Sequence, residues 1–499
     1  MCGIVGYVGA QQAAPILLEG LQKLEYRGYD SAGIAVLDGS TIELAKACGE
    51  IKNLLAKTHD GSDLHGYIGL GHTRWATHGA PTEANAHPHV SNDGKFAIVQ
   101  NGIIENFMEL REMLQAKGFR FHSETDTEVI VHLLDMYYTG DGNLKDTVLK
   151  TLGRLEGSYA IGILCADCPE QMFLARNGCP LIIGVGAGEN FFASDVTALV
   201  SHTKNVVYLD DGELAEVRAD SYTVFDCTGK PIEKPVSRVA WDIEAAEKGG
   251  YEHFMLKEIM EQPRAIKSTL DPRVKDHRVV FDELKMTDAQ LMGFNKIMIT
   301  ACGSAFYAGQ AGKYALEKLT HIPVDADLAS EFRYRDPIVD EHTLMIIISQ
   351  SGETADTIAA IREAQSKGAY VLSIVNVVGS TIARISDDVI YTWAGPEIAV
   401  ATTKGYTTQV SVLYLLALYL GEKRGCLSRE EAAKLTDDLM ILPQMVQRAI
   451  DLNPQIAQLA ERYKNNPSLF FIGRNVDYAV CMEGSLKLKE ISYLHSEAY

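Results

Sequence analysis

The second residue of the chain is a cysteine, Cys2, which follows Met1 and precedes Gly3. Removal of Met1 would leave Cys2 with both a thiol and a free α-amino group, whose ordinary pKa of ~7.7–8.0 lies near neutral pH. Such an amine can act as the base for its own thiol, which makes the residue a candidate N-terminal nucleophile. The alternative is a cysteine that stands at this position by chance.

A second group of polar residues stands in the segment SQSGET, directly after the apolar run Leu344–Ile348. Continuous apolar runs of this kind are typical of buried parallel strands. Backbone N–H groups at the start of the helix predicted after the segment could bind a phosphate, assisted by nearby hydroxyls. The loop could also be only a helix N-cap. Its candidate ligands are Ser349, Gln350, Ser351 and Thr354.

A third group lies near the end of the sequence, where Glu483, Lys487, Glu490 and Leu494 follow one another at i, i+4, i+7 and i+11. This spacing places them on one face of a predicted helix. The simple interpretation is an exposed stripe of ion pairs, each worth only ~0.3–0.5 kcal/mol.

Length and composition exclude several classes of protein. The 499 residues suggest about three domains, and 46% hydrophobic with 22% charged residues is typical of a globular chain. The net charge of -20 argues against a nucleic-acid binder. Nine scattered cysteines predict no disulfide framework.

The longest apolar stretch, Val410–Leu420, is too short to span a membrane, and the N-terminus lacks a signal peptide. We therefore expect a cytoplasmic protein.

The elements that must position Cys2 are short strands separated by glycine turns, which predict an α+β layered domain over residues 2–220. One helix is predicted over Pro15–Leu24. Another should begin near Thr125, since Thr125 and Glu128 have capping-box spacing. The predicted strands are 3–9, 31–37, 67–76, 95–102, 158–166 and 190–195.

The second half predicts an α/β doubly wound architecture. Residues 221–287 are interpreted as an interdomain connection, with a charged helix over 244–270. Residues 288–427 alternate strand, glycine loop and helix. Long helices are predicted over Thr407–Glu422 and Ser428–Leu452. Residues 460–499 repeat the plan of Lys296–Leu319, which suggests a duplicated domain. Because Tyr499 ends an apparent helix without a stop signal, we expect this second copy to be incomplete.

Six motifs in the first half resemble the class II glutamine amidotransferase domain, an N-terminal-nucleophile domain. They are CGIVGYVG, LEYRGYDSAGIA, GHTRWATHG, NAHPH, QNGIIEN and SETDTE, in this order. The resemblance implies that Cys2 is the nucleophile and that Asn101 and Gly102 supply the oxyanion donors. It also implies that Arg74 binds the α-carboxylate of glutamine and Asp126 its α-ammonium group. Alternatively, the Asp126 carboxylate has only a structural role, in which its negative charge complements the dipole of a helix at its N-terminus.

The same resemblance assigns three more residues to the glutamine site. Trp75 resembles the family's ammonia-channel gate, although a Trp is more often part of a core, and Thr77 and His78 belong to the same mobile loop. His72, His87 and His89 suggest a metal at first sight. Their spacing does not match a helical H-x-x-x-H site, so we expect neither a metal nor another cofactor.

Further motifs resemble the glutamine–fructose-6-phosphate aminotransferase family, in which an amidotransferase domain precedes paired sugar isomerase domains. They are ACGSAFYAG, SQSGET, EIAVATTKGYTTQ and EGSLKLKEISYLHSEAY. The resemblance implies that Glu490, with Lys487 nearby, moves a proton between C1 and C2 of the sugar. Where the family often has Cys-Gly-Thr-Ser, this chain has Cys-Gly-Ser-Ala, so Ala305 cannot be a side-chain ligand. The implied sugar-phosphate residues are Ser304, Ser349, Gln350, Ser351, Thr354 and Val400.

The family resemblance implies conversion of fructose 6-phosphate and glutamine to glucosamine 6-phosphate and glutamate, the first step of amino sugar biosynthesis, by a homodimer. The family's ring-opening His and imine-forming Lys would follow Tyr499, so we expect a fragment without the sugar reaction. One alternative is a class II amidotransferase with a phosphoribosyl or aspartyl acceptor, but no pyrophosphate or ATP motif follows residue 240. The other is a sugar-phosphate-sensing module, which would leave Cys2 and the Arg74 loop without a purpose.

Overall fold

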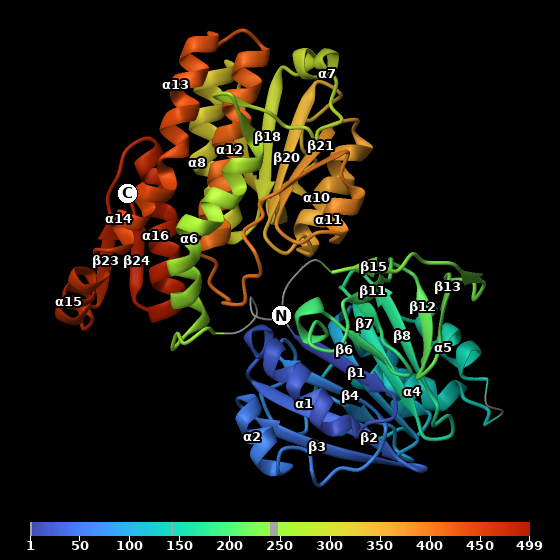
Figure 1. Ribbon diagram of the computed structural model, residues 1–499. Coiled ribbons are helices and arrows are strands. Elements are labelled where there is room, and N and C mark those ends of the chain that lie inside the picture. Colours follow the sequence, from blue (N-terminus) through green and yellow to red (C-terminus); the bar gives the residue numbers. More distant parts are fainter. Residues whose placement is uncertain (1, 141–142, 240–247) are drawn as a thin grey trace. The chain divides into compact units, whose positions relative to one another are not determined.

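The computed structural model describes residues 2–140, 143–239 and 248–499. The chain divides into two compact units, Met1–Ile243 and Glu244–Tyr499 (Figure 1). Within the described ranges, no helix combines the length and the apolar character that a membrane span requires.

The described part of the first unit contains two antiparallel sheets. The eight-stranded sheet has the order β15-β11-β9-β10-β1-β4-β2-β3 and the seven-stranded sheet the order β14-β13-β12-β8-β7-β6-β5. The strands of the first are β1 (Gly3–Val8), β2 (Ser31–Asp38), β3 (Thr41–Cys48), β4 (Ile68–Arg74), β9 (Ile182–Val185), β10 (Asn190–Ala193), β11 (Asn205–Tyr208) and β15 (Ser237–Arg238). Those of the second are β5 (His89–Val90), β6 (Phe96–Ile104), β7 (Gly157–Cys165), β8 (Gln171–Asn177), β12 (Leu214–Arg218), β13 (Tyr222–Phe225) and β14 (Pro231–Ile232).

Helices cover the outer faces of both sheets, so the first unit has four layers. One apolar cluster joins α1 and α2 to the eight-stranded sheet, a second lies between the sheets, and a third joins the remaining helices to the seven-stranded sheet. The expected α+β layered domain is confirmed. The helices are α1 (Ala13–Leu24), α2 (Ile51–Lys57), α3 (Phe107–Ala116), α4 (Glu128–Tyr137) and α5 (Leu144–Leu152).

The Phe192 ring links the two sheets. Phe192 in β10 lies opposite Gly6 in β1, and a Cβ added at Gly6 would meet the Phe192 ring at 1.8 Å. On the facing sheet, a Cβ at Gly162 in β7 would meet the same ring at 2.7 Å. The Phe192 ring therefore fits between the sheets because neither glycine carries a side chain.

The predicted capping box before α4 is wrong. The helix begins at Glu128, and its N-cap residue Thr127 makes no side-chain cap. The Glu128 carboxylate instead accepts hydrogen bonds from the backbone N–H groups of His122 and Ser123, both at 2.7 Å. The Thr125 hydroxyl is hydrogen bonded to Ser123. The side chains of Thr125 and Glu128, whose spacing predicted a capping box, thus form hydrogen bonds with the loop before the helix instead.

The second unit is built on a five-stranded parallel sheet with the order β19-β18-β20-β21-β22, which confirms the expected doubly wound α/β fold. Its strands are β18 (Lys296–Ala301), β19 (Val324–Leu328), β20 (Thr343–Ser349), β21 (Tyr370–Val375) and β22 (Asp388–Tyr391). Short hairpin strands β16 (Val274–Lys275) and β17 (Arg278–Val279) precede it.

Both faces of the parallel sheet are buried, as its continuous apolar strands require. Along β20, Leu344, Ile346 and Ile348 pack into the cluster that contains α8 and α12, whereas Met345 and Ile347 pack into the cluster with α10 and α11 (Figure 1). The helices are α6 (Phe254–Leu270), α7 (Asp288–Gly293), α8 (Gly303–Thr320), α9 (Ala329–Phe332), α10 (Ala355–Ser366), α11 (Thr381–Ile385), α12 (Lys404–Lys423), α13 (Arg429–Met440), α14 (Leu442–Ile450), α15 (Asn453–Tyr463) and α16 (Val476–Ser492).

Several predicted helix bounds in this half differ from those observed. The helix predicted over Ser428–Leu452 is divided into α13 and α14 at Ile441, and Pro443 stands in the first turn of α14, where its missing N–H costs nothing. The helix predicted over 244–270 begins at Phe254 within the described residues, while 244–247 lie outside them.

The prediction that a helix continues to Tyr499 is wrong. Helix α16 ends at Ser492, because Tyr493 adopts a left-handed conformation with φ 59°. The chain then forms β24 (His495–Ala498), which pairs in parallel with β23 (Ser468–Phe471). These elements form a two-stranded sheet beside α16, within the stretch interpreted as the second isomerase domain.

The segment 221–287, interpreted as an interdomain connection, contributes to both units. Strands β13 and β14 extend the seven-stranded sheet and β15 pairs with β11. Helix α6 packs against α12 in the second unit. Residues 240–247 lie outside the described part of the chain.

The contact between Gly162 and Phe192 predicts the effect of one added methyl group. We expect Gly162→Ala to lower the free energy of unfolding by ~1–3 kcal/mol, because the Phe192 ring has no room to retreat in a packed core. The control is Gly153→Ala, where the new Cβ has only an ordinary contact of 3.5 Å. Denaturant unfolding measures both variants, and equal midpoints would contradict this interpretation.

Candidate functional site

Cys2 lies at the start of β1, next to the end of the neighbouring strand β4. The register pairs Gly3 with Thr73, so Cys2 faces the chain where it leaves β4. The Trp75 backbone N–H donates to the Cys2 Sγ at 3.3 Å. Burial raises the pKa of the Cys2 thiol above its ordinary value, and the nearby Arg74 cation only partly offsets this. The thiol therefore needs a base to become a nucleophile near neutral pH.

Asn101 reaches the same point from the facing sheet. Its side-chain Nδ2 donates to the backbone oxygen of Cys2 at 3.2 Å. The His72 Nε2 lies 3.1 Å from both the Asn101 Oδ1 and the Gln100 backbone oxygen. Because both of these atoms are acceptors, Nε2 carries the proton of the neutral ring. His72 thereby fixes which end of the Asn101 amide faces Cys2.

Gly102 follows Asn101 in β6 and has a φ of 110°. A Cβ at this position would lie 2.1 Å from the Ser158 backbone oxygen. Only glycine can adopt this backbone at such a close approach. The residue type at 102 is therefore required by the conformation of the strand end beside Cys2.

The Arg74 guanidinium is buried and donates to carbonyl oxygens of the loop that follows β4. Its partners are His78, Gly79 at 3.3 Å and Ala80 at 3.3 Å. The cation thus lies beneath this loop and holds its turn in place. Thr77 is exposed on the loop, and His78 is partly exposed.

Asp126 lies on the other side of the loop. Its Oδ2 accepts the Ile104 backbone N–H at 2.8 Å, and its Oδ1 lies 3.9 Å from the His78 Nδ1. Burial raises the pKa of Asp126, while the Ile104 N–H and the His78 and Arg74 charges oppose the rise. Cys2, Arg74, Asn101 and Asp126 therefore belong to one connected cluster within the first unit.

Trp75 does not lie in the core. Its side chain is 40% exposed and packs edge-on against Tyr29. The loop backbone is fixed nearby by Asp30, whose carboxylate accepts the Ala76 N–H at 2.7 Å.

Three buried histidine rings contact one another in sequence, beginning with His72, which bonds to Asn101. The His72 and His87 ring centroids lie 4.2 Å apart, and those of His87 and His89 lie 4.8 Å apart. Burial lowers the pKa of His72 to about 3 and holds those of His87 and His89 well below the ordinary value. Among the described residues, no group of three or more His, Cys, Asp or Glu side chains has the geometry of a metal site.

The second group of candidate residues lies in the other unit, at the carboxyl ends of β18 and β20. The chain continues from β18 to β19 on one side and returns to β20 on the other, so the strand order reverses between them. Ligands of open α/β sheets bind at such switch points. Ser304, in the first turn of α8, follows β18, and the Ser349–Thr354 loop follows β20.

The Ser349–Thr354 loop is organised by its own hydroxyl groups. The Ser349 Oγ accepts the Gly352 N–H at 3.0 Å, and the Ser351 Oγ accepts the Glu353 N–H at 3.2 Å. Thr354 is the N-cap residue of α10 and its hydroxyl lies 3.3 Å from that of Ser349. Hydroxyl and N–H groups therefore converge at the start of a helix.

The stretch that contains Val400 lies beside this loop. A Cβ added at Gly405 would lie 3.3 Å from the Cγ of Gln350. Asn376, directly after β21, connects the same two stretches, since its N–H donates to the Gln350 oxygen and its side-chain amide donates to the Gly395 oxygen at 2.8 Å. The Val400 side chain is 57% exposed.

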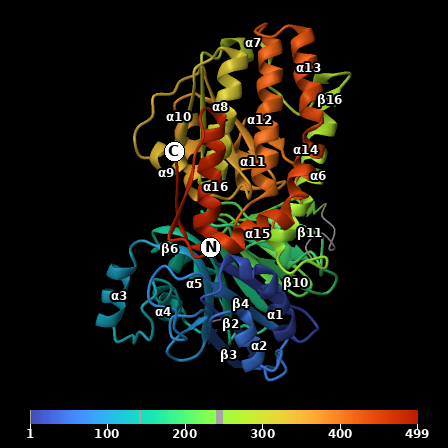
Figure 2. The same cartoon turned by 90° about the vertical axis from the view of Figure 1, so that its left-hand side faces the viewer.

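Helix α16 brings the third group of residues against α8 (Figure 2). Lys487 pairs with Glu490 at 2.6 Å and lies 3.7 Å from Glu483. Burial raises the pKa of Glu483 to about 7, although Lys487 and the Ser304 hydroxyl oppose the rise. The spacing predicted this face correctly for three residues, but Leu494 lies beyond the helix end.

The patterns in the sequence did not indicate the contributions of His72, Asp30 and Asn376 to these sites. His72 and Arg74 are two residues apart in β4, so strand periodicity indicates that they share the inner face. For Asp30 and Asn376 the sequence carries no such signal, because their partners lie far away along the chain.

The buried histidines predict a pH dependence. Their folded pKa values lie below the ordinary 6.5 of the unfolded chain, so the unfolded state binds more protons below that pH. We expect the free energy of unfolding of the first unit to fall as pH decreases below ~6.5, by up to ~1.4 kcal/mol per pH unit for each histidine. Imidazole NMR signals of His72 should not titrate between pH 8 and 5. Exposed His59, whose pKa Asp63 raises, serves as the titrating control.

Comparison with known proteins identifies the two units. A glutamine amidotransferase domain model matches residues 50–237, and a SIS domain model matches residues 290–419. In the solved structures, the C-terminal domain of glucosamine-fructose-6-phosphate aminotransferase from Francisella tularensis is similar with a TM-score of 0.50 and 39% identity, covering 51% of this chain and 71% of that one.

Curated relatives match the whole chain. Glutamine–fructose-6-phosphate aminotransferase (isomerizing) from Caldanaerobacter subterraneus subsp. tengcongensis is 54% identical and that from Methanosarcina acetivorans is 49% identical. The alignments cover 100% of this chain and 82% of each relative. This chain belongs to the glutamine–fructose-6-phosphate aminotransferase (isomerizing) family.

Proposed function

We propose that this chain provides the glutamine site and the sugar-phosphate site for the conversion of D-fructose 6-phosphate and L-glutamine to D-glucosamine 6-phosphate and L-glutamate. The observation that carries the proposal is the contact of the Cys2 backbone with the Asn101 amide in a chain of this family. The glutaminase reaction would take place in the first unit and the sugar reaction in the second. No cofactor is needed for either step.

In the first unit, Cys2 attacks the side-chain amide carbon of glutamine. Because burial raises the pKa of the thiol, the free α-amino group left by removal of Met1 serves as its base. The Asn101 side-chain amide and the Gly102 N–H stabilise the negative oxygen of the tetrahedral intermediate. Ammonia leaves, and water then hydrolyses the thioester to release glutamate.

The neighbouring charges bind the ends of the glutamine substrate. Arg74 binds its α-carboxylate through the planar guanidinium. Asp126 binds its α-ammonium group, and this cation offsets the burial that raises the Asp126 pKa. Thr77 and His78 close over the substrate from the loop that Arg74 holds, and Trp75 gates the passage of ammonia.

In the second unit, the phosphate of the sugar binds where hydroxyl and N–H groups converge at the start of α10. Ser349, Ser351 and Thr354 contact it, Ser304 approaches from α8, and Gln350 and Val400 border the sugar. Ammonia condenses with the C2 carbonyl of the open-chain sugar, and water leaves. Glu490 then removes a proton from C1 of this imine and returns one to C2, which yields the aldose. Lys487 holds the Glu490 carboxylate in place.

We further propose that the enzyme is a cytoplasmic homodimer without nucleic-acid or membrane partners. The nine cysteines, which are all free thiols, support a reducing compartment. The net charge of -20 supports the absence of a nucleic-acid partner. The homodimer rests on the family resemblance and can be tested by sedimentation.

The nucleophile can be tested by labelling. A glutamine analogue with an electrophilic carbon should modify one cysteine, Cys2, in protein that lacks Met1, because only this thiol has an adjacent amine base. We expect Cys2→Ala to abolish both labelling and glutamate release, and the exposed Cys227 provides the control variant Cys227→Ala. Intact-protein mass and glutamate assays measure the outcome. Labelling that persists in Cys2→Ala would refute the assignment.

A companion variant, Asn101→Ala, removes one oxyanion donor and should lower kcat for glutamine hydrolysis by ~10²–10³-fold.

The sugar-phosphate loop can be tested with Ser351→Ala in the full-length enzyme. We expect a KM for fructose 6-phosphate at least fivefold higher, because one hydroxyl contact to the phosphate is lost. Glutamine hydrolysis without sugar should not change, since Cys2 lies in the other unit. Ser366→Ala, at the far end of α10, is the control, because its hydroxyl donates to the Glu363 backbone oxygen within the same helix. An unchanged sugar KM in Ser351→Ala would contradict the phosphate site.

A further inference from the structure

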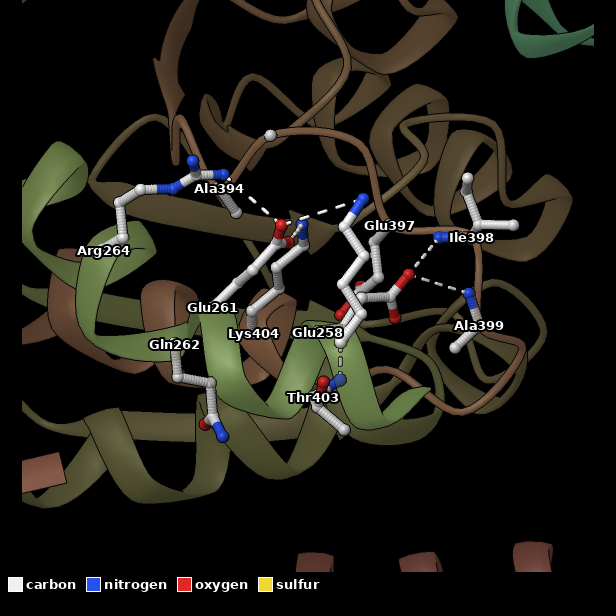
Figure 3. Close-up of polar contacts among 12 residues, drawn as sticks. Glu258, Glu261, Gln262, Arg264, Ala394, Glu397, Ile398, Ala399, Thr403 and Lys404 are labelled. Atoms are coloured by element: carbon white, nitrogen blue, oxygen red, sulfur yellow. Dashed lines mark hydrogen bonds and ion pairs between the residues drawn. The ribbon is translucent and has the colours of Figure 1, made fainter. Parts of the chain in front are cut away.

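A buried carboxylate of α6, Glu258, holds the stretch of backbone that contains Val400. Glu258 is only 2% exposed. Its Oε1 accepts the N–H groups of Ile398 at 2.6 Å and Ala399 at 3.0 Å, as Figure 3 shows. Its Oε2 is buried and has no hydrogen-bond partner among the described residues. One oxygen of a side chain from a distant helix thus fixes two successive peptide groups.

A second carboxylate, Glu397, fixes the other end of the same stretch. It accepts the Thr403 N–H at 2.8 Å (Figure 3). It also accepts the Gly405 N–H at 3.0 Å and the Thr402 hydroxyl. The chain therefore folds around Glu397 as it enters α12. We call residues 397–403 the 397–403 loop.

An ion pair between α6 and α12 lies where this loop ends. Lys404, which is 2% exposed, donates to the Glu261 carboxylate of α6 at 2.6 Å. Glu261 also lies 3.4 Å from Arg264 and 3.9 Å from Lys257. Glu258 and Glu261 thus connect one face of α6 to the loop and to the start of α12 (Figure 3).

The electrostatics favour a hydrogen-bonding role for Glu258 over an ion pair. Burial raises its pKa to about 7, and Glu397 adds to the rise, while the two loop N–H groups and Lys404 oppose it. What Glu258 supplies to the loop is an acceptor oxygen, which a neutral amide side chain also carries.

The loop held in this way borders the phosphate loop. Gly405 packs against Gln350, and Asn376 joins the Gln350 backbone to Gly395. Between the peptide groups fixed by Glu258 and those fixed by Glu397 lies Val400, whose side chain is 57% exposed. Anchors on both sides of an exposed apolar residue are typical of a binding loop on a rigid support.

We propose that Glu258 is a positioning residue for the sugar reaction, which holds the 397–403 loop in the conformation that presents Val400 to the sugar at the Ser349–Thr354 loop. The proposal rests on the sugar-phosphate site of the proposed function. Glu258 itself does not touch the substrate. Its effect is to fix the backbone before the substrate arrives, so that binding does not have to order the loop.

The experiment compares Glu258→Ala with Glu258→Gln in the full-length enzyme. Alanine removes the acceptor, so the KM for fructose 6-phosphate should rise at least fivefold, while glutamine hydrolysis without sugar stays within twofold. Glutamine retains the acceptor oxygen, so the sugar KM should return to within twofold of the native value. Gln262→Ala is the matched control on the same helix, since its side chain bonds to the Ile259 oxygen of α6.

Glu258→Asp replaces the alanine variant if that variant does not fold, because it keeps the carboxylate but withdraws it by one methylene group. A sugar KM within twofold of native in Glu258→Ala, or in Glu258→Asp where that variant is used, would overturn the proposal. So would a Glu258→Gln variant as impaired as Glu258→Ala. Ser351→Ala separates the two hypotheses: if it raises the sugar KM and Glu258→Ala does not, only the positioning role fails. If neither variant raises it, the phosphate site itself is wrong.

Discussion

The antiparallel pairing of β1 with β4 is the constraint on which the glutamine site depends. Its register sets Gly3 opposite Thr73, which brings Cys2 at the start of one strand against Trp75 just beyond the end of the other. A shift by one residue would turn every side chain of β1 to the opposite face. The register is fixed because Ile4 packs between the sheets while Val5 and Tyr7 pack against the helices.

The second sheet completes the site through buried polar contacts. His72 from β4 meets the Asn101 side chain from β6, so a hydrogen bond crosses the apolar layer between the sheets. A buried amide without such a partner would cost free energy and could rotate. The neutral state that burial imposes on His72 is what gives its ring a single N–H for this purpose.

In the second unit, the corresponding constraint is the reversal of strand order between β18 and β20. It places two helix starts, those of α8 and α10, at one edge of the sheet, and the 397–403 loop reaches the same edge from β22. The loop has no sheet partners of its own, so carboxylate side chains satisfy its N–H groups. The buried Glu258 of α6 and the partly buried Glu397 of the loop itself do this, and the same contacts set the position of Val400.

The sequence by itself determined the layered α+β fold of the first half, the doubly wound α/β fold of the second half, the six strands predicted in the first half, and the motifs that assign the chain to its family. These signals are local: a strand or a glycine loop is recognisable in a short window of residues. Only the tertiary structure decided that His72 orients Asn101, that Glu128 serves the loop before α4 instead of a capping box, and that the chain after Tyr493 is a strand. The role of Glu258 was equally hidden, since its partners lie 140 and 141 positions away. A buried polar group is defined by what surrounds it, and packing of distant segments supplies those surroundings.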